Sequence, residues 1–286
     1  MIIGLTKMAL VSNFEDNNIF HNFAFDIILY YHPRYKKAII NSDNIDLQHP
    51  VQKWRYFVFK KIYAKVEYKK YVKKKHKKYY KGYDFSNFIN YEQSKHMINI
   101  YNKLTKFTFG EYILLVQRGE NNRYLYDYST KLKIEDYLKN KNLKIPIRVC
   151  NFENMTPQEQ YDICSKCLFF IAAHGAGCTN IIFTPKMTPL IEINFRKHWY
   201  CDPVCDKHIK GEISINSKCN GRLKFKPQFH KADYHNLCHL INKKYIEMEA
   251  IEYSEGFLSK NPICKQKIYI DGNVLIERIN FERSFI

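Results

Sequence analysis

The stretch from residue 168 to residue 194, LFFIAAHGAGCTNIIFTPKMTPLIEIN, contains two apolar runs separated by a glycine-containing loop. The runs, residues 168–173 and 189–193, are short, nearly continuous and rich in branched or aromatic side chains. Runs of this kind are typical of strands that are buried on both faces of a parallel sheet. The stretch therefore predicts two parallel strands, with the sequence HGAG at residues 174–177 directly after the first of them.

Strands and helices alternate on both sides of this stretch. Thr156 and Glu159 form a capping box, and Pro157 takes the first helical position, which together mark the start of a helix. The apolar spacing predicts further strands at residues 112–116, 145–150 and 245–248, and helices near residues 131–140, 156–166 and 234–241. Such alternation indicates an α/β fold, with a parallel sheet covered by helices on both faces.

The first hundred residues follow a less regular pattern. Their apolar stretches predict a buried helix, a strand and a second helix at residues 20–31, 37–40 and 91–104. We place a domain boundary near Lys106, which divides the chain into residues 1–106 and residues 107–286. This division leaves open that the last helix packs back on the first domain.

The charge of the chain is strongly basic and unevenly distributed. The formal net charge is +18, and residues 53–81 contain thirteen Lys or Arg residues and one acidic residue. Trp54, Val58, Ile62 and Val66 recur every four residues there, which predicts a basic amphipathic helix. Three interpretations remain open: a surface helix with a solvated lysine face, a contact with an anionic membrane surface, or single-stranded nucleic acid bound through the mixed cations and aromatics.

The nine cysteines and the hydropathy pattern bear on the compartment. Several cysteines lie in apolar runs, which indicates reduced thiols in a core. Cys164 with Cys167, and Cys201 with Cys205, do not form the four-ligand pattern of a structural zinc site. No apolar run approaches a membrane span, and the first residues do not resemble a signal peptide. We expect a cytoplasmic or peripheral membrane protein.

The HGAG loop, which we call the glycine loop (residues 174–177), is the strongest candidate for chemistry. Ligands of α/β sheets bind beyond the carboxyl ends of strands, and this loop lies at such an end. Gly175 and Gly177, with Ala176 between them, allow backbone N–H groups to approach an anion, and a short helix containing Thr179 and Asn180 follows. The pattern is neither a P-loop nor a dinucleotide fingerprint. It suits a phosphate or diphosphate, although an ordinary tight turn also fits it.

Two other predicted strands end in residues that suit the same ligand. Glu192 and Asn194 close the strand after the glycine loop, where a carboxylate can hold ribose hydroxyls. Arg118 and Arg123 follow the strand at residues 112–116, and arginine forks suit diphosphate oxygens. These strand ends together predict a nucleotide-binding edge of the sheet.

These motifs resemble those of glycosyltransferase family 61. Residues 168–194 are similar to its HGAG-x-TN loop and following IEI strand, and residues 152–160, FENMTPQEQ, resemble its FE-x-M-x-x-x-EQ segment. Arg118 and Arg123 match its spaced arginines. The sequence NIFH at residues 18–21 resembles its N-x-x-H motif, and residues 234–248 resemble its C-terminal Y-x-x-L…Y-x-E element.

The resemblance implies a GT-B fold, in which two Rossmann-like domains face each other across a cleft. It implies an inverting transferase that moves a hexose or pentose from a nucleotide sugar, usually a UDP-sugar, to a hydroxyl of a glycan or protein. His21 and Asp26 become candidate catalytic residues. The donor site would contain Arg118, Arg123, His174, Gly175, Ala176, Gly177, Thr179, Asn180, Glu192 and Asn194.

Neither a metal nor another cofactor is expected. The sequence contains no Asp-x-Asp triplet, a motif that holds a divalent metal in many other glycosyltransferases. Fixed cations and N–H groups would stabilise the leaving diphosphate instead. Two alternatives stay open: a basic protein that binds nucleic acid or membrane, and an inactive glycosyltransferase-like interaction module.

Overall fold

The structure is a computed structural model of the 286-residue chain. It describes residues 8–11, 37–41, 49–69, 91–105, 109–119, 123–194, 232–253 and 267–285. Some predicted features lie outside the described residues, namely the helix at 20–31, His21, Asp26, and the pair Cys201 and Cys205.

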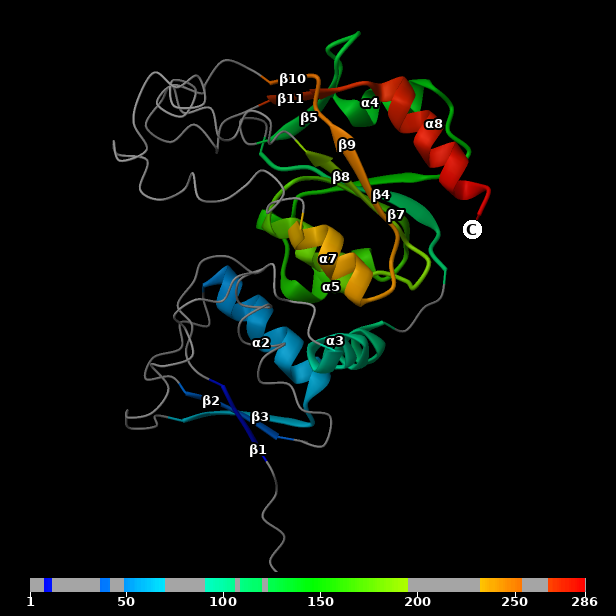
Figure 1. Cartoon of the computed structure of the whole chain (residues 1–286). Coiled ribbons are helices and arrows are strands. Elements are labelled where there is room, and N and C mark those ends of the chain that lie inside the picture. The colour runs from blue at the N-terminus through cyan, green and yellow to red at the C-terminus, as the bar shows by residue number, and fades with distance from the viewer. Residues whose placement is uncertain are drawn as a thin grey trace, which may run out of the picture.

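A five-stranded parallel sheet forms the centre of the molecule (Figure 1). Its strands, in spatial order, are β6 (Ile147–Cys150), β4 (Tyr112–Val116), β7 (Cys167–Ala173), β8 (Leu190–Asn194) and β9 (Tyr245–Glu249). Neighbouring strands are parallel throughout. All five were predicted from their apolar runs, and the mixed α/β fold with a parallel sheet is confirmed. Side chains of β4 alternate between the two sides, with Leu114 in one apolar cluster and Leu115 in the other.

Helices cover both faces of this sheet (Figure 1). On one face lie α4 (Ile134–Asn140) and α8 (Gly272–Arg283), whose buried residues join one apolar cluster. On the other lie α5 (Pro157–Cys164), α7 (Ala232–Leu240) and the 3-10 helix η5 (Ala176–Phe183). The capping box at Thr156 is confirmed. The predicted helix to residue 166 is too long, because α5 ends at Cys164 and Cys167 already begins β7.

The N-terminal part adds a three-stranded parallel sheet and two helices. The strands are β1 (Met8–Val11), β2 (Lys37–Asn41) and β3 (Lys65–Lys69), and the helices are α2 (Pro50–Ile62) and α3 (Tyr91–Leu104). The predicted strand at 37–40 and the predicted helix at 91–104 are confirmed. A third sheet has the strand order β10 (Glu252–Tyr253), β11 (Lys267–Ile270) and β5 (Tyr124–Asp127).

The predicted basic helix is shorter than expected. It ends at Ile62, and Val66 lies in β3, so the four-residue period does not continue as a helix. Trp54, Val58 and Ile62 are at most 2% exposed and pack in the protein core. The apolar face of α2 is therefore covered by protein, and the interpretation that this helix lays that face in a lipid interface is wrong. No helix among the described ranges has the length and apolarity that a bilayer crossing requires.

The packing of the helices crosses the predicted domain boundary at Lys106. Residues of α2 and α3 share one apolar cluster with α5, η5 and α7. The last helix, α8, packs against α4 on the far face of the main sheet, through the cluster that contains Leu275 and Ile279. The last helix predicted from the sequence, near residues 234–241, corresponds to α7, which shares an apolar cluster with α2 and α3.

Buried thiols should make the protein less stable at alkaline pH. Five described cysteines are buried, and burial raises the pKa of the Cys150 thiol to about 12, from an ordinary value of 9.0. Between these values the folded state keeps a proton that the unfolded chain releases. The stabilising contribution is complete below pH 9 and is lost as pH rises towards 12.

Cys150→Ala should remove this contribution. From pH 8 to pH 10, the wild type should lose about 1.4 kcal/mol more free energy of unfolding than the variant. Urea unfolding at the two pH values measures the difference. An identical pH dependence in both proteins would contradict the prediction.

Candidate active site

The glycine loop follows β7 at the carboxyl end of the parallel sheet, as predicted. The His174 N–H donates to the carbonyl of Ile193 in β8 at 2.9 Å, and the Cys178 N–H donates to the carbonyl of Gly175 at 2.9 Å. The loop then enters η5, so the predicted short helix is present as a 3-10 helix. Residues 175–177 are partly exposed, which leaves their backbone within reach of a ligand.

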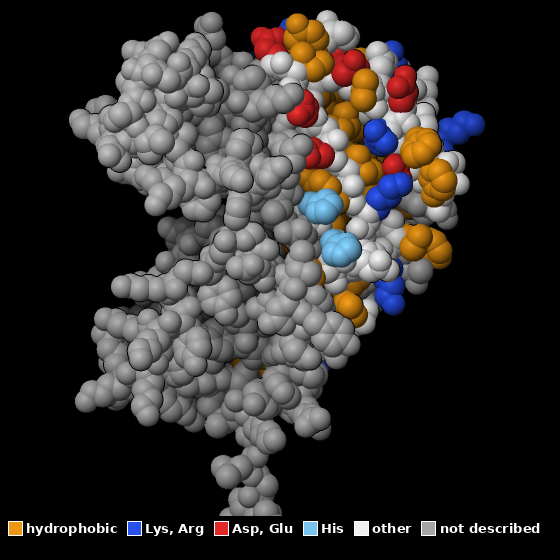
Figure 2. Space-filling model, in the orientation of Figure 1, with side chains coloured by type: hydrophobic (Ala, Val, Ile, Leu, Met, Phe, Trp, Pro, Cys, Tyr) orange, Lys and Arg blue, Asp and Glu red, His pale blue; other side chains and the backbone are white. Residues whose placement is uncertain are grey.

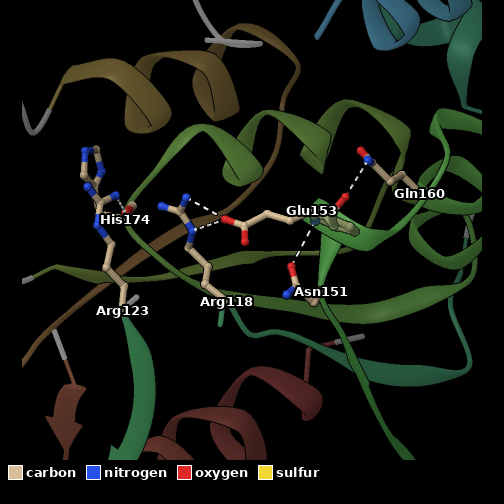
Figure 3. Close-up of polar contacts among 7 residues, drawn as sticks. Arg118, Arg123, Asn151, Glu153, Gln160 and His174 are labelled. Carbon is tan, nitrogen blue, oxygen red and sulfur yellow. Dashed lines mark hydrogen bonds and ion pairs between the residues drawn. The ribbon is translucent and has the colours of Figure 1, made fainter. Parts of the chain in front are cut away.

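Arg123 is buried against the glycine loop. It lies just before β5 and is 8% exposed, and its Nη1 donates to the carbonyl of His174 at 2.8 Å (Figure 3). Its φ of 57° is uncommon for a residue other than glycine, and such conformations concentrate at functional sites. The backbone thus holds an arginine in a less favourable conformation beside the loop.

Arg118 reaches the same loop from the end of β4. A Cβ atom added to Gly175 would lie 2.9 Å from Nη1 of Arg123 and 3.7 Å from Nη1 of Arg118. Arg118 also donates from Nε and Nη2 to Oε1 of Glu153, at 3.0 and 2.7 Å (Figure 3). The structure therefore brings together the glycine loop and two guanidinium groups, whose residues lie 52 and 57 positions before Gly175 in the sequence.

Glu192 faces protein groups. Its side chain is 1% exposed, with Oε1 bonded to Nδ1 of His174 and Oε2 accepting from the Tyr245 hydroxyl at 2.7 Å. The His174 ring also packs against Tyr234, with ring centroids 5.6 Å apart. A carboxylate in this position orients His174. The predicted contact of Glu192 with ribose hydroxyls stays a prediction.

Asn194 lies at the end of β8, near the same edge of the sheet. It is 6% exposed, and its Nδ2 donates to Oε1 of Glu247 in β9 at 2.5 Å. This contact ties the ends of two neighbouring strands together.

Thr179 and Asn180 are fully buried in η5. Asn180 accepts from Nε1 of Trp54 in α2 at 2.8 Å and donates from Nδ2 to Oε1 of Gln160 in α5 at 3.0 Å. Within the described residues the Thr179 hydroxyl has no hydrogen-bond partner. The predicted direct contact of these two residues with a donor stays a prediction. In the structure, Asn180 supports the glycine loop from behind, by joining η5 to α2 and α5.

Asn180→Ala should destabilise the protein. It leaves the buried Trp54 N–H without its acceptor and Gln160 without its donor, so we expect a loss of about 2 kcal/mol in the free energy of unfolding. Chemical denaturation measures it, and a double-mutant cycle with Trp54→Phe isolates the pair. If the two changes are additive, the Trp54–Asn180 bond contributes no stability.

Three residues that hold the site were not assigned a role from the sequence. Glu153 and Gln160 belong to the FE-x-M-x-x-x-EQ resemblance, so a signal existed for them. Trp54 appeared only as one residue of an apolar period. Its polar contact with Asn180 joins positions 126 residues apart, which no local pattern indicates.

The comparisons with known proteins identify the family. A family model described as Glycosyltransferase 61 matches residues 18–191, which is more than half of the chain. The chain belongs to glycosyltransferase family 61. It therefore has a glycosyltransferase domain, and glycosyltransferases in general use a sugar donor and an acceptor. A search of curated proteins found no match.

The extent of the family-61 match includes most of the candidate site. It begins at residue 18, so it contains His21 and Asp26, and it covers both arginines and the glycine loop. It ends at residue 191, one position before Glu192. No group of three or more metal-ligating side chains is found among the residues with described positions.

Proposed function

We propose that this chain transfers a sugar from a UDP-sugar to a hydroxyl of a glycan or protein, with the donor diphosphate bound at the glycine loop. The observation that carries the proposal is the convergence of Arg118 and Arg123 on Gly175. Two arginines and the partly exposed loop residues 175–177 suit the charge and the oxygen atoms of a diphosphate.

The proposed reaction is a single displacement with inversion at the anomeric carbon. The acceptor hydroxyl oxygen forms a bond to this carbon as the bond to the diphosphate oxygen breaks. Negative charge then develops on the leaving diphosphate, where Arg118, Arg123 and the loop N–H groups are placed to stabilise it. We expect no requirement for a metal.

The acceptor proton requires a general base. His21 and Asp26 remain the candidates. His21 matches the family's N-terminal motif, Asp26 lies one position beyond the place of the family's aspartate, and both lie outside the described residues. His174 is the alternative. Its position beside Arg123 and its bond to Glu192 favour a role in holding the diphosphate end of the donor.

We further propose that the chain adopts the two-domain GT-B arrangement. Two parallel sheets, β1–β3 and the five-stranded sheet, support it. In this arrangement the donor binds the C-terminal sheet, and the N-terminal part supplies acceptor groups.

A basic protein that binds nucleic acid or an anionic membrane is the second candidate. The thirteen basic residues within 53–81 favour it. On the face drawn in Figure 2, the described Lys and Arg side chains are interspersed with acidic and apolar ones. Because phosphate-backbone binding weakens steeply with salt, strong salt dependence would indicate this function. An inactive module would show no transfer with any donor.

A thermal-stability panel tests the proposed donor site. The melting temperature is measured with nucleotides and nucleotide sugars, with and without EDTA. A ligand that binds only the folded protein raises the melting temperature. At a ligand concentration about a hundred times Kd, the folded state is stabilised by about 2.7 kcal/mol. We expect stabilisation by UDP or one UDP-sugar that is unchanged by EDTA. Strict dependence on added manganese would contradict the proposed chemistry.

A further inference from the structure

Glu153 is a half-exposed carboxylate held on a rigid turn beside the glycine loop. It lies in the 3-10 turn η4 (Phe152–Asn154), where its N–H donates to Oδ1 of Asn151 at 2.9 Å (Figure 3). Nε2 of Gln160 donates to the carbonyls of Phe152 and Met155, at 3.0 and 3.1 Å. The same Gln160 also bonds Asn180 in η5. One hydrogen-bonded network therefore fixes Glu153 relative to the helix that follows the loop.

This carboxylate holds one edge of the Arg118 guanidinium. Nε and Nη2 of Arg118 both donate to Oε1 of Glu153, while Nη1 is the nitrogen nearest to Gly175. The pair lowers the effective positive charge that Arg118 presents to a ligand. It also occupies Nε and Nη2, which form one of the edges that a guanidinium offers to a phosphate in a bidentate contact.

The Arg118–Glu153 pair has little to contribute to folding. The two side chains are 35% and 47% exposed, and ion pairs with this exposure contribute about 0–1 kcal/mol to stability. An incoming diphosphate carries more negative charge than one carboxylate and offers two oxygens to the fork. It is therefore able to replace Glu153 as the partner of Arg118.

We propose that Glu153 is a counter-anion that the donor diphosphate displaces from Arg118 and that takes Arg118 back as the nucleoside diphosphate product leaves. This inference rests on the proposed function, since it places the diphosphate between Arg118 and Arg123. Glu153 then weakens binding of the product and speeds its release. This arrangement favours a high rate of turnover over the tightest binding of the nucleoside diphosphate.

Glu153→Gln tests this role. The amide keeps the size and one acceptor oxygen but removes the charge, so the variant should bind UDP about three- to tenfold more tightly. Its dissociation of UDP should be slower by a similar factor. Isothermal titration with UDP and with inorganic diphosphate measures the affinity, and stopped-flow competition measures the release. Glu277→Gln, an exposed residue of α8, is the control for loss of one negative charge.

A double-mutant cycle locates the effect. In an Arg118→Gln background, Glu153→Gln should no longer change the affinity, because the arginine it competes for is gone. Equal or weaker binding by Glu153→Gln in a folded protein would overturn the inference and leave the donor site standing. A wild-type protein that binds neither UDP nor diphosphate would overturn the proposed function, and this inference with it. Glu153→Ala serves as a second variant if the glutamine form does not fold.

Discussion

Replacing Gly175 by valine should weaken binding of UDP by at least about a hundredfold, with the fold preserved. A Cβ at this position would lie 2.9 Å from Nη1 of Arg123, which is too close. Arg123 is buried and bonded to the His174 carbonyl, so the valine and the guanidinium cannot both keep their places. The substitution therefore distorts the arrangement of Arg123 and the glycine loop, and the charge-assisted bonds to the diphosphate that are lost are together worth about 3 kcal/mol.

Gly119→Val is the matched control for this substitution. Gly119 lies next to Arg118, and a Cβ there meets nothing within 4 Å. The Gly119→Val variant should bind UDP as tightly as the wild type does. Isothermal titration gives both affinities, and circular dichroism reports the fold. Normal binding of UDP by Gly175→Val would show that the glycine loop is only a structural turn.

Glu192→Gln should lower the free energy of unfolding by about 3 kcal/mol and reduce donor binding as well. Both partners of the buried carboxylate, the His174 ring and the Tyr245 hydroxyl, donate to it. A glutamine side chain can accept from one of them and presents its NH2 group to the other. The mismatch leaves a buried donor unpaired and releases the His174 ring at the start of the glycine loop.

Tyr245→Phe separates the two parts of this effect. It removes one donor and leaves the His174–Glu192 contact, so its cost should be about 1 kcal/mol with little change in donor affinity. Urea unfolding and titration with UDP measure both quantities for each variant. If Glu192→Gln were as stable as the wild type, the buried contact would not hold the loop.

The main sheet could be predicted from the sequence because each strand is a separate apolar run. Residues 112–116 and 168–173 are short runs of apolar side chains, and such runs are typical of strands that are buried on both faces of a parallel sheet. The prediction that the helix continues beyond Ile62 was wrong. A single apolar residue at position 66 is compatible with the period of a helix and with that of a strand, and it lies in β3. β5 was missed since its sequence, YLYD, is short and lies between polar segments.

The candidate site was predicted in its positions but less well in its roles. Strand ends of a parallel sheet meet at one edge, so Arg118, Arg123 and the glycine loop could be placed together. The partners of each group depend on tertiary packing. Glu192 was expected to face a ribose, and only the structure shows that Tyr245 and His174 occupy its oxygens.

A crystal structure of the protein with UDP, grown in the presence of EDTA, tests the central claim most directly. We predict that the diphosphate lies over Gly175, with its oxygens within hydrogen-bond distance of Arg118, Arg123 and N–H groups of residues 175–177. Glu153 should then be separated from Arg118. A diphosphate bound elsewhere, or held by a metal without either arginine, would contradict the account.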